Sequence, residues 1–227
     1  MPRLLINKHW STLKRLVAIK SAAAKPYQEF DYLQTSGYNA RIDTGVPGND
    51  NTLVIDFVYM RLDNANYFGA FGNYEGEAKK CWRVIQSGTT YPDYCIVTAG
   101  NTKASSSMSI KSAAQTNIGH KVNFKLSWGK VETEDDTGYK SSATLPDDTS
   151  AEDSKFTIAI GANSPPGTGS TTRGRFYGHF RIWSQGELIR DYVPAVRVAD
   201  NKAGFLDKVN GTFNPSIGSV EFIAGND

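Results

Sequence analysis

The sequence predicts an all-β protein in which two antiparallel sheets pack face to face. Two observations carry this prediction. Short segments with strand-like alternation, about ten to thirteen of them, follow one another with turn residues between them, and after residue 26 no segment has the apolar period of a helix. The composition agrees, because 21 glycines, 11 tyrosines and 11 phenylalanines in 227 residues are typical of a turn-rich globular protein.

Three segments, 52–60, 120–129 and 175–183, show the two-residue period of a strand most clearly. In the first, one face is wholly apolar and the other nearly so, which predicts a strand covered on both sides, as in a two-sheet sandwich; the wholly apolar face holds Leu53, Ile55, Phe57 and Tyr59. In the second, the residues expected to face inwards are Val122, Phe124, Leu126 and Trp128. In the third, the residues that share one face are Phe176, Gly178, Phe180 and Ile182. Weaker alternation predicts shorter strands at 67–71, 81–85, 94–98, 108–110 and 156–160. Residues 131–153 are acidic and polar, and we interpret them as a surface excursion with one strand near residues 140–145.

The segment from residue 174 to residue 215 is expected to hold two hairpins that close the β structure. Ser184-Gln185-Gly186 supplies the first turn, and Asn210-Gly211 signals a short second hairpin because both residue types tolerate positive φ. We expect the strand that begins near Leu188 to end at Pro194, which cannot donate a hydrogen bond to a neighbouring strand.

The pair Lys25-Pro26 divides the chain into an arm, residues 1–26, and one β domain, residues 27–227. The first 28 residues hold six basic residues and no acidic one, so this part carries a charge of +6. The remaining 19 basic and 23 acidic residues give −4. The net charge of +2 therefore hides a basic arm on a mildly acidic body.

The arm has the pattern of an amphipathic helix that Ser11 would cap. Isolated helices of about 12 to 15 residues are marginal in water, so this one should be ordered only when docked on a partner or on the body. We interpret the arm as an anchor, with a frayed terminus as the alternative. Nucleic-acid binding is disfavoured, because the arm holds one tryptophan and no known motif. The docking residues would be Arg3, Lys8, Trp10, Leu13, Lys14, Arg15, Leu16, Val17 and Lys20.

Membrane insertion and secretion are not expected. No stretch approaches the roughly 18 to 20 apolar residues that span a bilayer, and Lys14, Arg15 and Lys20 interrupt the apolar run that a signal peptide needs. The two cysteines, Cys81 and Cys95, lie on segments expected to be neighbouring strands, and the loop between them places them out of register. Two free thiols are favoured, in agreement with assembly in a reducing cytoplasm, and a disulfide is the alternative.

Three stretches near the ends of the body resemble a known family. They are YLQTSGYNARIDTGV at residues 32–46, FRIWSQGELIRDYVPAVR at residues 180–197 and GFLDKVNGTFNP at residues 204–215. They are similar to the concanavalin A-like, laminin-G-like jelly-roll modules of tailed-phage and prophage virion proteins. The resemblance spans residue 30 to about residue 225, with generic sequence from 62 to 173. It implies a two-sheet jelly-roll sandwich and a place on a phage particle assembled in the host cytoplasm.

No constellation for catalysis is visible in the sequence. The fold that the resemblance implies also carries glucanases, whose paired carboxylates alternate with apolar residues on one strand, and the acidic run Glu132–Asp136 lacks those apolar residues. The three histidines lie far apart, and there is no G-x-S-x-G motif. We therefore predict a non-enzymatic protein without cofactor or metal. Calcium in the loops at 49–51 and 135–136 is the less favoured alternative to solvated loops.

An aromatic cluster is the best sequence candidate for a ligand site. Sugars stack on exposed rings flanked by polar groups, and one expected hairpin gathers residues of both kinds. They are Trp82, Arg83, Tyr91, Asp93 and Tyr94. The alternative is that alternate members of this set fill the core.

The sequence thus predicts a structural protein of a tailed-phage virion, either a capsid accessory or decoration protein or a baseplate component. Its arm would dock on other virion proteins, such as the major capsid protein or a tail protein. The observation behind this hypothesis is the basic arm on an acidic body. The alternative is a receptor-binding module that recognises a glycan on the host surface.

Overall fold

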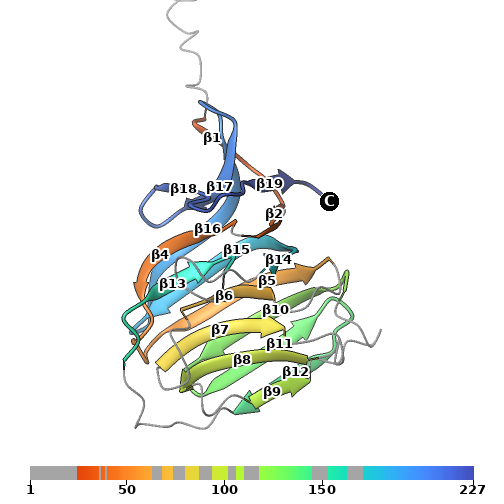
Figure 1. Cartoon of the computed structure of the whole chain (residues 1–227), viewed down its shortest axis with the longest axis vertical. Coiled ribbons are helices and arrows are strands. Elements are labelled where there is room, and N and C mark those ends of the chain that lie inside the picture. Colours follow the sequence, from red (N-terminus) through yellow and green to blue (C-terminus); the bar gives the residue numbers. More distant parts are fainter. Residues whose placement is uncertain are drawn as a thin grey trace, which may run out of the picture.

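The structure, a computed structural model, describes residues 25–35, 37–38, 40–62, 68–73, 80–86, 94–101, 106–109, 118–144, 153–162 and 171–227. The predicted arm helix lies outside these residues. Within them the chain is all β, and no helix has the length and apolar character that crossing a membrane requires. Two antiparallel sheets pack into a jelly-roll sandwich, which confirms the predicted fold class of the body (Figure 1).

The strands are numbered in chain order. They are β1 (Tyr27–Glu29), β2 (Tyr32–Thr35), β3 (Gly37–Tyr38), β4 (Ile42–Pro47), β5 (Val54–Arg61), β6 (Phe68–Gly72), β7 (Lys80–Gln86), β8 (Tyr94–Asn101), β9 (Ser106–Ser109), β10 (Lys121–Ser127), β11 (Lys130–Asp135), β12 (Lys140–Thr144), β13 (Thr157–Ile160), β14 (Thr171–Thr172), β15 (Gly174–Ser184), β16 (Glu187–Arg197), β17 (Lys202–Asp207), β18 (Phe213–Pro215) and β19 (Phe222–Gly225). Each shorter strand that the sequence predicts is present, with its ends shifted by at most three residues.

The large sheet has the strand order β12-β11-β10-β5-β15-β16-β17-β18, and β1, β2 and β19 pair onto its side. The second sheet has the order β4-β13-β6-β7-β8-β9, and β3 pairs with β14 in a separate ribbon. Figure 1 shows β1 and the turn between β16 and β17 at one end of the molecule, which we call the upper pole. Strands β11 and β12 lie towards the other end, the lower pole.

Strand β15 holds the middle of the large sheet. One edge pairs with β5, and the other pairs first with β2 and then with β16. Gly178 and His179 form a bulge between Tyr177 and Phe180, which lie opposite adjacent residues of β5. Because the bulge inserts two residues, the alternation keeps its phase, and Phe180 shares the face of Phe176 as predicted; this face is buried in the core. Gly178 is exposed, with a φ of 59° that suits glycine, so the prediction that it shares one face with Phe176 and Phe180 is wrong.

Phe57 of β5 stands at the centre of the core. Its ring stacks on Phe124 of β10 at 5.0 Å and on Phe180 of β15 at 4.9 Å. It meets Phe71 of the second sheet edge-on at 5.2 Å. Aromatic pairs of this kind stabilise a core beyond the area that they bury. One ring therefore joins three strands of the large sheet to the facing sheet, and the predicted inward face of residues 122–126 is confirmed. The strand at 52–60 was expected to be covered on both sides, but only its wholly apolar face is buried throughout, and Val54, Asp56 and Val58 on the other face are partly exposed.

Pro194 does not end its strand, contrary to the prediction. Strand β16 continues to Arg197, and Pro194 lies opposite Phe205 of β17. The Pro194 carbonyl accepts a hydrogen bond of 3.0 Å from the amide of Phe30, on the side of β16 away from β17. The nitrogen and the carbonyl of one strand residue point to the same side. The missing N–H therefore faces away from β17, and no hydrogen bond to β17 is lost.

Residues 130–135 form a strand, which corrects the predicted surface excursion. Strand β11 pairs with β10 along its length and buries Val131, Thr133 and Asp135. Two of these three inward residues are polar, so the apolar alternation that marks a strand is absent from the sequence. Trp128 lies in the turn between β10 and β11 instead of in the strand, and is partly buried. The strand expected near residues 140–145 is confirmed as β12.

Both hairpins near the end of the chain are present. Gln185 and Gly186 form the first turn with φ values of 52° and 83°, as the sequence predicts. The second hairpin joins β17 to β18 through a longer loop, residues 208–211, instead of a two-residue turn. A hydrogen bond of 2.8 Å from the amide of Asp207 to the carbonyl of Thr212 closes this loop.

Replacing Phe57 with alanine should lower the free energy of unfolding by about 3 to 5 kcal/mol, because the change leaves a cavity between the sheets. Chemical denaturation followed by tryptophan fluorescence measures this loss. Ile217→Ala is the control, because Ile217 is 58% exposed and its truncation should change stability by less than about 0.5 kcal/mol. Equal effects of the two substitutions would contradict the central position of Phe57.

Candidate functional site

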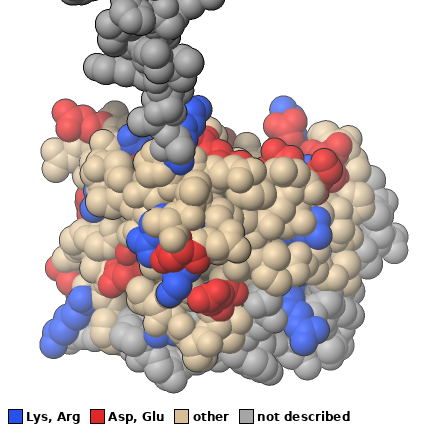
Figure 2. Space-filling model, turned by 90° about the horizontal axis from the view of Figure 1, so that it is seen from above, with Lys and Arg blue, Asp and Glu red and all other residues tan. Residues whose placement is uncertain are grey.

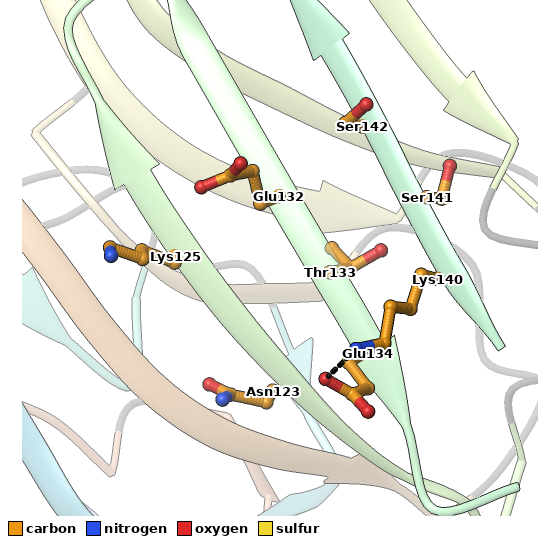
Figure 3. A pocket seen from close by; sticks show the side chains of 8 residues that line it. All are labelled: Asn123, Lys125, Glu132, Thr133, Glu134, Lys140, Ser141 and Ser142. Carbon is orange, nitrogen blue, oxygen red and sulfur yellow. Dashed lines mark ion pairs between the residues drawn. The ribbon is translucent and has the colours of Figure 1, made fainter. Parts of the chain in front are cut away.

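The described surface is hollowed on the outer face of the large sheet. Alternate residues of β10, β11 and β12 face the core, so their neighbours point outwards. The hollow has a volume of about 420 Å³ (Figure 3), and its lining residues are Asn123, Lys125, Glu132, Thr133, Glu134, Lys140, Ser141 and Ser142. A second hollow of about 220 Å³ shares Asn123 and Glu134 with the first and reaches Lys121 and Asp136. We call the two together the β10–β12 groove.

The groove is polar, and its acidic groups are paired. Glu134 of β11 lies 3.3 Å from Lys140 of β12 (Figure 3). Glu132 accepts a hydrogen bond of 2.6 Å from Lys130, and this bond holds the pKa of Glu132 below its ordinary value. The exposed amide of Asn123 and the exposed hydroxyl of Ser142 also line the groove, whereas Thr133 borders it from the buried face of β11. Such a surface suits a neutral ligand rich in hydroxyl groups better than an apolar one.

A row of alternating charges crosses the same face. The strand registers place one charged residue on each of five neighbouring strands: Glu132, Lys125, Asp56, Arg181 and Asp191. Burial raises the pKa of Asp56, while Arg181 and Lys125 act in the opposite direction. Cross-strand pairs of opposite charge stabilise a sheet, which accounts for the row without a ligand.

Cationic and aromatic side chains surround the carboxylate of Asp227 on this face. Lys121 Nζ donates to Asp227 Oδ2 at 2.6 Å, and the Tyr177 hydroxyl donates to Oδ1 at 3.2 Å. Arg175 Nη1 lies 3.5 Å from the same Oδ1. Lys121 lies over the Tyr177 ring, and Arg175 over the Tyr32 ring. The hydrogen bond from Lys121 is the main reason that the pKa of Asp227 lies below its ordinary value of 3.8. We call these five residues the Asp227 cluster.

The arm residues that the sequence nominates for docking, from Arg3 to Lys20, lie outside the described residues. Tyr91 and Asp93 of the aromatic cluster lie outside them as well. Tyr94 is described only as the first residue of β8. For these positions the sequence interpretation stays a prediction.

Trp82 belongs to the core instead of to a ligand site. It is 0% exposed and packs edge-on against Trp128, with ring centres 5.5 Å apart. A buried ring offers no face to a sugar, so Trp82 cannot serve as the stacking residue that the sequence suggests. Arg83, the next residue of β7, is partly exposed. The alternative stated for this set, that some of its members fill the core, holds for Trp82.

Two carboxylates of the acidic run in β11, Glu132 and Glu134, line the same hollow, and each is paired with a lysine. Glu132 and Glu134 point out of the strand, whereas Asp135 points inwards and is 5% exposed. Asp135 Oδ1 accepts hydrogen bonds of 2.9 Å from the amides of Thr137 and Tyr139, so it caps the turn before β12. In the part of the chain that the structure describes, no three His, Cys, Asp or Glu side chains are grouped to hold a metal ion.

The other loop considered for calcium, residues 49–51, is closed by Asp50. Its carboxylate accepts hydrogen bonds of 2.7 Å from the hydroxyls of Thr52 and Ser184. These bonds lower the pKa of Asp50, although burial acts in the opposite direction. The carboxylate ties this loop to Ser184, the last residue of β15.

Cys81 is a free, buried thiol. The register of β7 and β8 places Cys81 opposite Gly100 and places Cys95 opposite Gln86, so the predicted offset between the cysteines is confirmed. Burial raises the pKa of Cys81 to about 12. At neutral pH the thiol is therefore protonated and a poor nucleophile.

Comparison with known proteins adds a likeness of fold alone. No protein-family model and no curated protein matches the sequence. Among solved structures, the chain is similar to domains LG4-5 of the mouse laminin α1 chain, with 15% identity and a TM-score of 0.48. The match covers 71% of this chain and 44% of the laminin chain, so this protein spans less than half of that structure's length. A likeness of this size carries no argument about function, and the fold class rests on the strand pairing described above.

The side chain of Asp227 should titrate below 3.8 in the folded protein, because the Lys121 ammonium favours its charged form. A carboxyl ¹³C NMR titration measures this pKa. The contacts of Asp227 contribute stability above pH 3.8, and the contribution is lost as the pH falls through the lowered pKa. Lys121→Met should return the pKa towards its ordinary value, whereas Lys130→Met, the control on the same face, should not. An unshifted Asp227 would contradict the contacts.

Proposed function

We propose that the protein is a non-enzymatic structural component of a tailed-phage virion, with its jelly-roll body displayed and its arm docked on the particle. One observation carries the proposal, the charge of +6 on the first 28 residues against −4 on the rest. A basic amphipathic arm is attracted to an acidic surface, and its apolar face needs a partner to bury against. A capsid decoration protein or a baseplate component would use its arm in this way, docked on the major capsid protein or on a tail protein.

The place where the chain enters the body supports an anchoring role. The carbonyl of Pro26 accepts a hydrogen bond of 3.0 Å from the amide of Val198, in the turn between β16 and β17. The chain therefore enters at the upper pole, whereas β11 and β12 of the groove lie towards the lower pole (Figure 1). Anchoring at the upper pole would leave the groove free for other contacts.

The described surface of the upper pole carries charges of both signs, so it offers no acidic patch to which the basic arm could bind. On the face in Figure 2, Lys and Arg side chains are interspersed with Asp and Glu side chains. Arg197 pairs with Asp200 at 2.6 Å, and Lys208 pairs with Glu29. Paired charges of both signs give little net attraction for a basic segment. This pattern favours a partner protein, and not the body, as the acidic surface that receives the arm.

Deleting residues 1–25 should leave a folded, soluble body that no longer joins the virion, because the body would lose its anchor. Mass spectrometry of purified particles measures incorporation, and circular dichroism reports the fold. Lys14→Gln combined with Arg15→Gln should weaken incorporation more at low salt than at high salt, because salt screens the attraction that these two charges contribute. Undiminished incorporation of the truncated protein would refute the proposal.

The β10–β12 groove favours a second candidate function, recognition of a glycan. A hollow of about 420 Å³ lined by an exposed amide, an exposed hydroxyl and paired charges offers hydrogen bonds to the hydroxyl groups of a sugar. The groove lies away from the anchored upper pole (Figure 1). A body displayed on the particle would therefore present the groove to a host surface. In this case the protein would be a receptor-binding module.

A glycan array should then show saturable binding, and Asn123→Ala should weaken it about tenfold, because the loss of one buried hydrogen bond costs about that factor. Isothermal titration with the best array ligand measures the change. Lys202→Ala is the control, since Lys202 is exposed on β17, outside the groove. If a glycan bound Asn123→Ala and the unsubstituted protein with equal affinity, the glycan site would not be the β10–β12 groove.

A further inference from the structure

We propose that Lys121, Arg175 and Tyr177 form a recognition site for the acidic side chain of a partner peptide, and that Asp227 occupies this site as an internal competitor. The three groups come from two strands, β10 and β15, and converge on one carboxylate. Two cations and a hydroxyl around a single carboxylate constitute a strong carboxylate receptor. This inference does not rest on the arm or on a glycan, although Lys121 also borders the second hollow of the β10–β12 groove.

The receptor groups are held in place by contacts that do not involve the bound carboxylate. Arg175 Nε donates to Gln34 Oε1 at 3.0 Å, and the guanidinium lies 4.1 Å from the centre of the Tyr32 ring. Lys121 Nζ lies 4.2 Å from the centre of the Tyr177 ring. Cation–π contacts restrict both long side chains. Because the donors are already positioned, binding a new carboxylate loses little side-chain freedom.

Asp227 is an exchangeable occupant of this site. Strand β19 ends at Gly225, so Asp227 is the second residue beyond the strand, and its side chain is 42% exposed. The strand itself is anchored by Phe222, which is 4% exposed and packs on Phe205 in the core. Exposed ion pairs contribute little to stability. Asn226 and Asp227 can therefore leave the receptor while β19 stays paired.

The contacts beside the carboxylate favour a peptide as the partner. The amide of Asp31 donates to Asn226 Oδ1 at 3.1 Å, and Asp31 Oδ2 accepts a hydrogen bond of 3.2 Å from the amide of Asp227. Asp31 thus contacts a side-chain amide and a backbone N–H, next to the cations that contact the carboxylate. An acidic sugar offers the carboxylate without the backbone amide. The arrangement fits an Asn-Asp pair in an extended segment of another protein.

Because Asp227 competes for the site, an external peptide must reach a minimum local concentration before it binds. A group tethered by a short linker acts as if it were present at about millimolar concentration. The apparent affinity for an external peptide falls in proportion to the fraction of molecules in which the site is free. Acidic segments would therefore bind only where they are presented at high local concentration, as on the neighbouring subunit of an assembly.

The test uses the full-length chain and the peptide acetyl-Gly-Asn-Asp-amide, which copies residues 225–227 with blocked ends. An NMR titration follows the backbone amides of Lys121, Arg175 and Tyr177. The peptide should bind Asp227→Asn at least about tenfold more tightly than the unsubstituted protein, because the competing charge is gone. Adding Lys121→Gln to Asp227→Asn should abolish this gain.

Two controls separate recognition from a general charge effect. Glu132→Gln removes another exposed carboxylate from the same face and should leave peptide affinity unchanged. The peptide acetyl-Gly-Asn-Asn-amide should fail to bind Asp227→Asn. Equal affinity for both peptides, or no gain on Asp227→Asn, would overturn the proposal. Binding of glucuronate at least as tight as that of the acidic peptide would assign the site to sugars and overturn the choice of partner.

Discussion

The rest of the structure depends on the hydrogen bonds that strand β15 makes along both of its edges. One edge pairs with β5 throughout, but the partner on the other edge changes from β2 to β16. Residues 175–177 pair with β2, and residues 180–184 pair with β16. The bulge at Gly178 and His179 falls between these two pairings, where the Gly178 amide donates to the Asp31 carbonyl at 3.0 Å. A two-residue bulge lets the strand change partners without turning its core face outwards.

Because the alternation of inward and outward residues continues across the bulge, β15 contributes residues both to the core and to the outer face of the sheet. Its inward residues, such as Phe176 and Phe180, pack against the ring of Phe57 in the core. Its outward residues, Arg175 and Tyr177, hold the carboxylate of Asp227. The position of the Asp227 cluster therefore follows from the packing between the sheets. The β10–β12 groove follows in the same way, since the inward face of β10 sets which of its residues point outwards.

Much of the fold could be predicted from the sequence, because most strands bury an apolar face and expose a polar one. The segment 122–126 shows this directly. The failures have physical reasons. Strand β11 was missed because Thr133 and Asp135 are polar yet buried, with hydrogen bonds supplied by their own turn in the case of Asp135. Pro194 was misjudged because its effect depends on which edge of the strand its nitrogen faces, and that is a tertiary property.

The candidate sites were harder to predict than the fold. The Asp227 cluster joins β10, β15 and the residue after β19 through contacts that have no local pattern in the sequence. Trp82 illustrates the opposite difficulty, because an aromatic residue next to polar ones can stack on a ligand or fill a core, and only the packing against Trp128 decides. The outward residues of β10 and β11 did offer a signal, since Asn123, Lys125, Glu132 and Glu134 alternate with inward residues on a hairpin.

The pairing of β2 has a consequence for how the chain folds during synthesis. Among the strands that the structure describes, β2 pairs only with β15 and β19, which follow it by about 140 and 190 residues. At about 5 to 20 residues per second, a ribosome needs on the order of ten seconds to deliver β15 after β2 has emerged. The large sheet cannot close in that interval, and β2 and β5 present unpaired edges to the surroundings. The body therefore folds late, when its last third has been made, and its early strands depend on slow, long-range pairing.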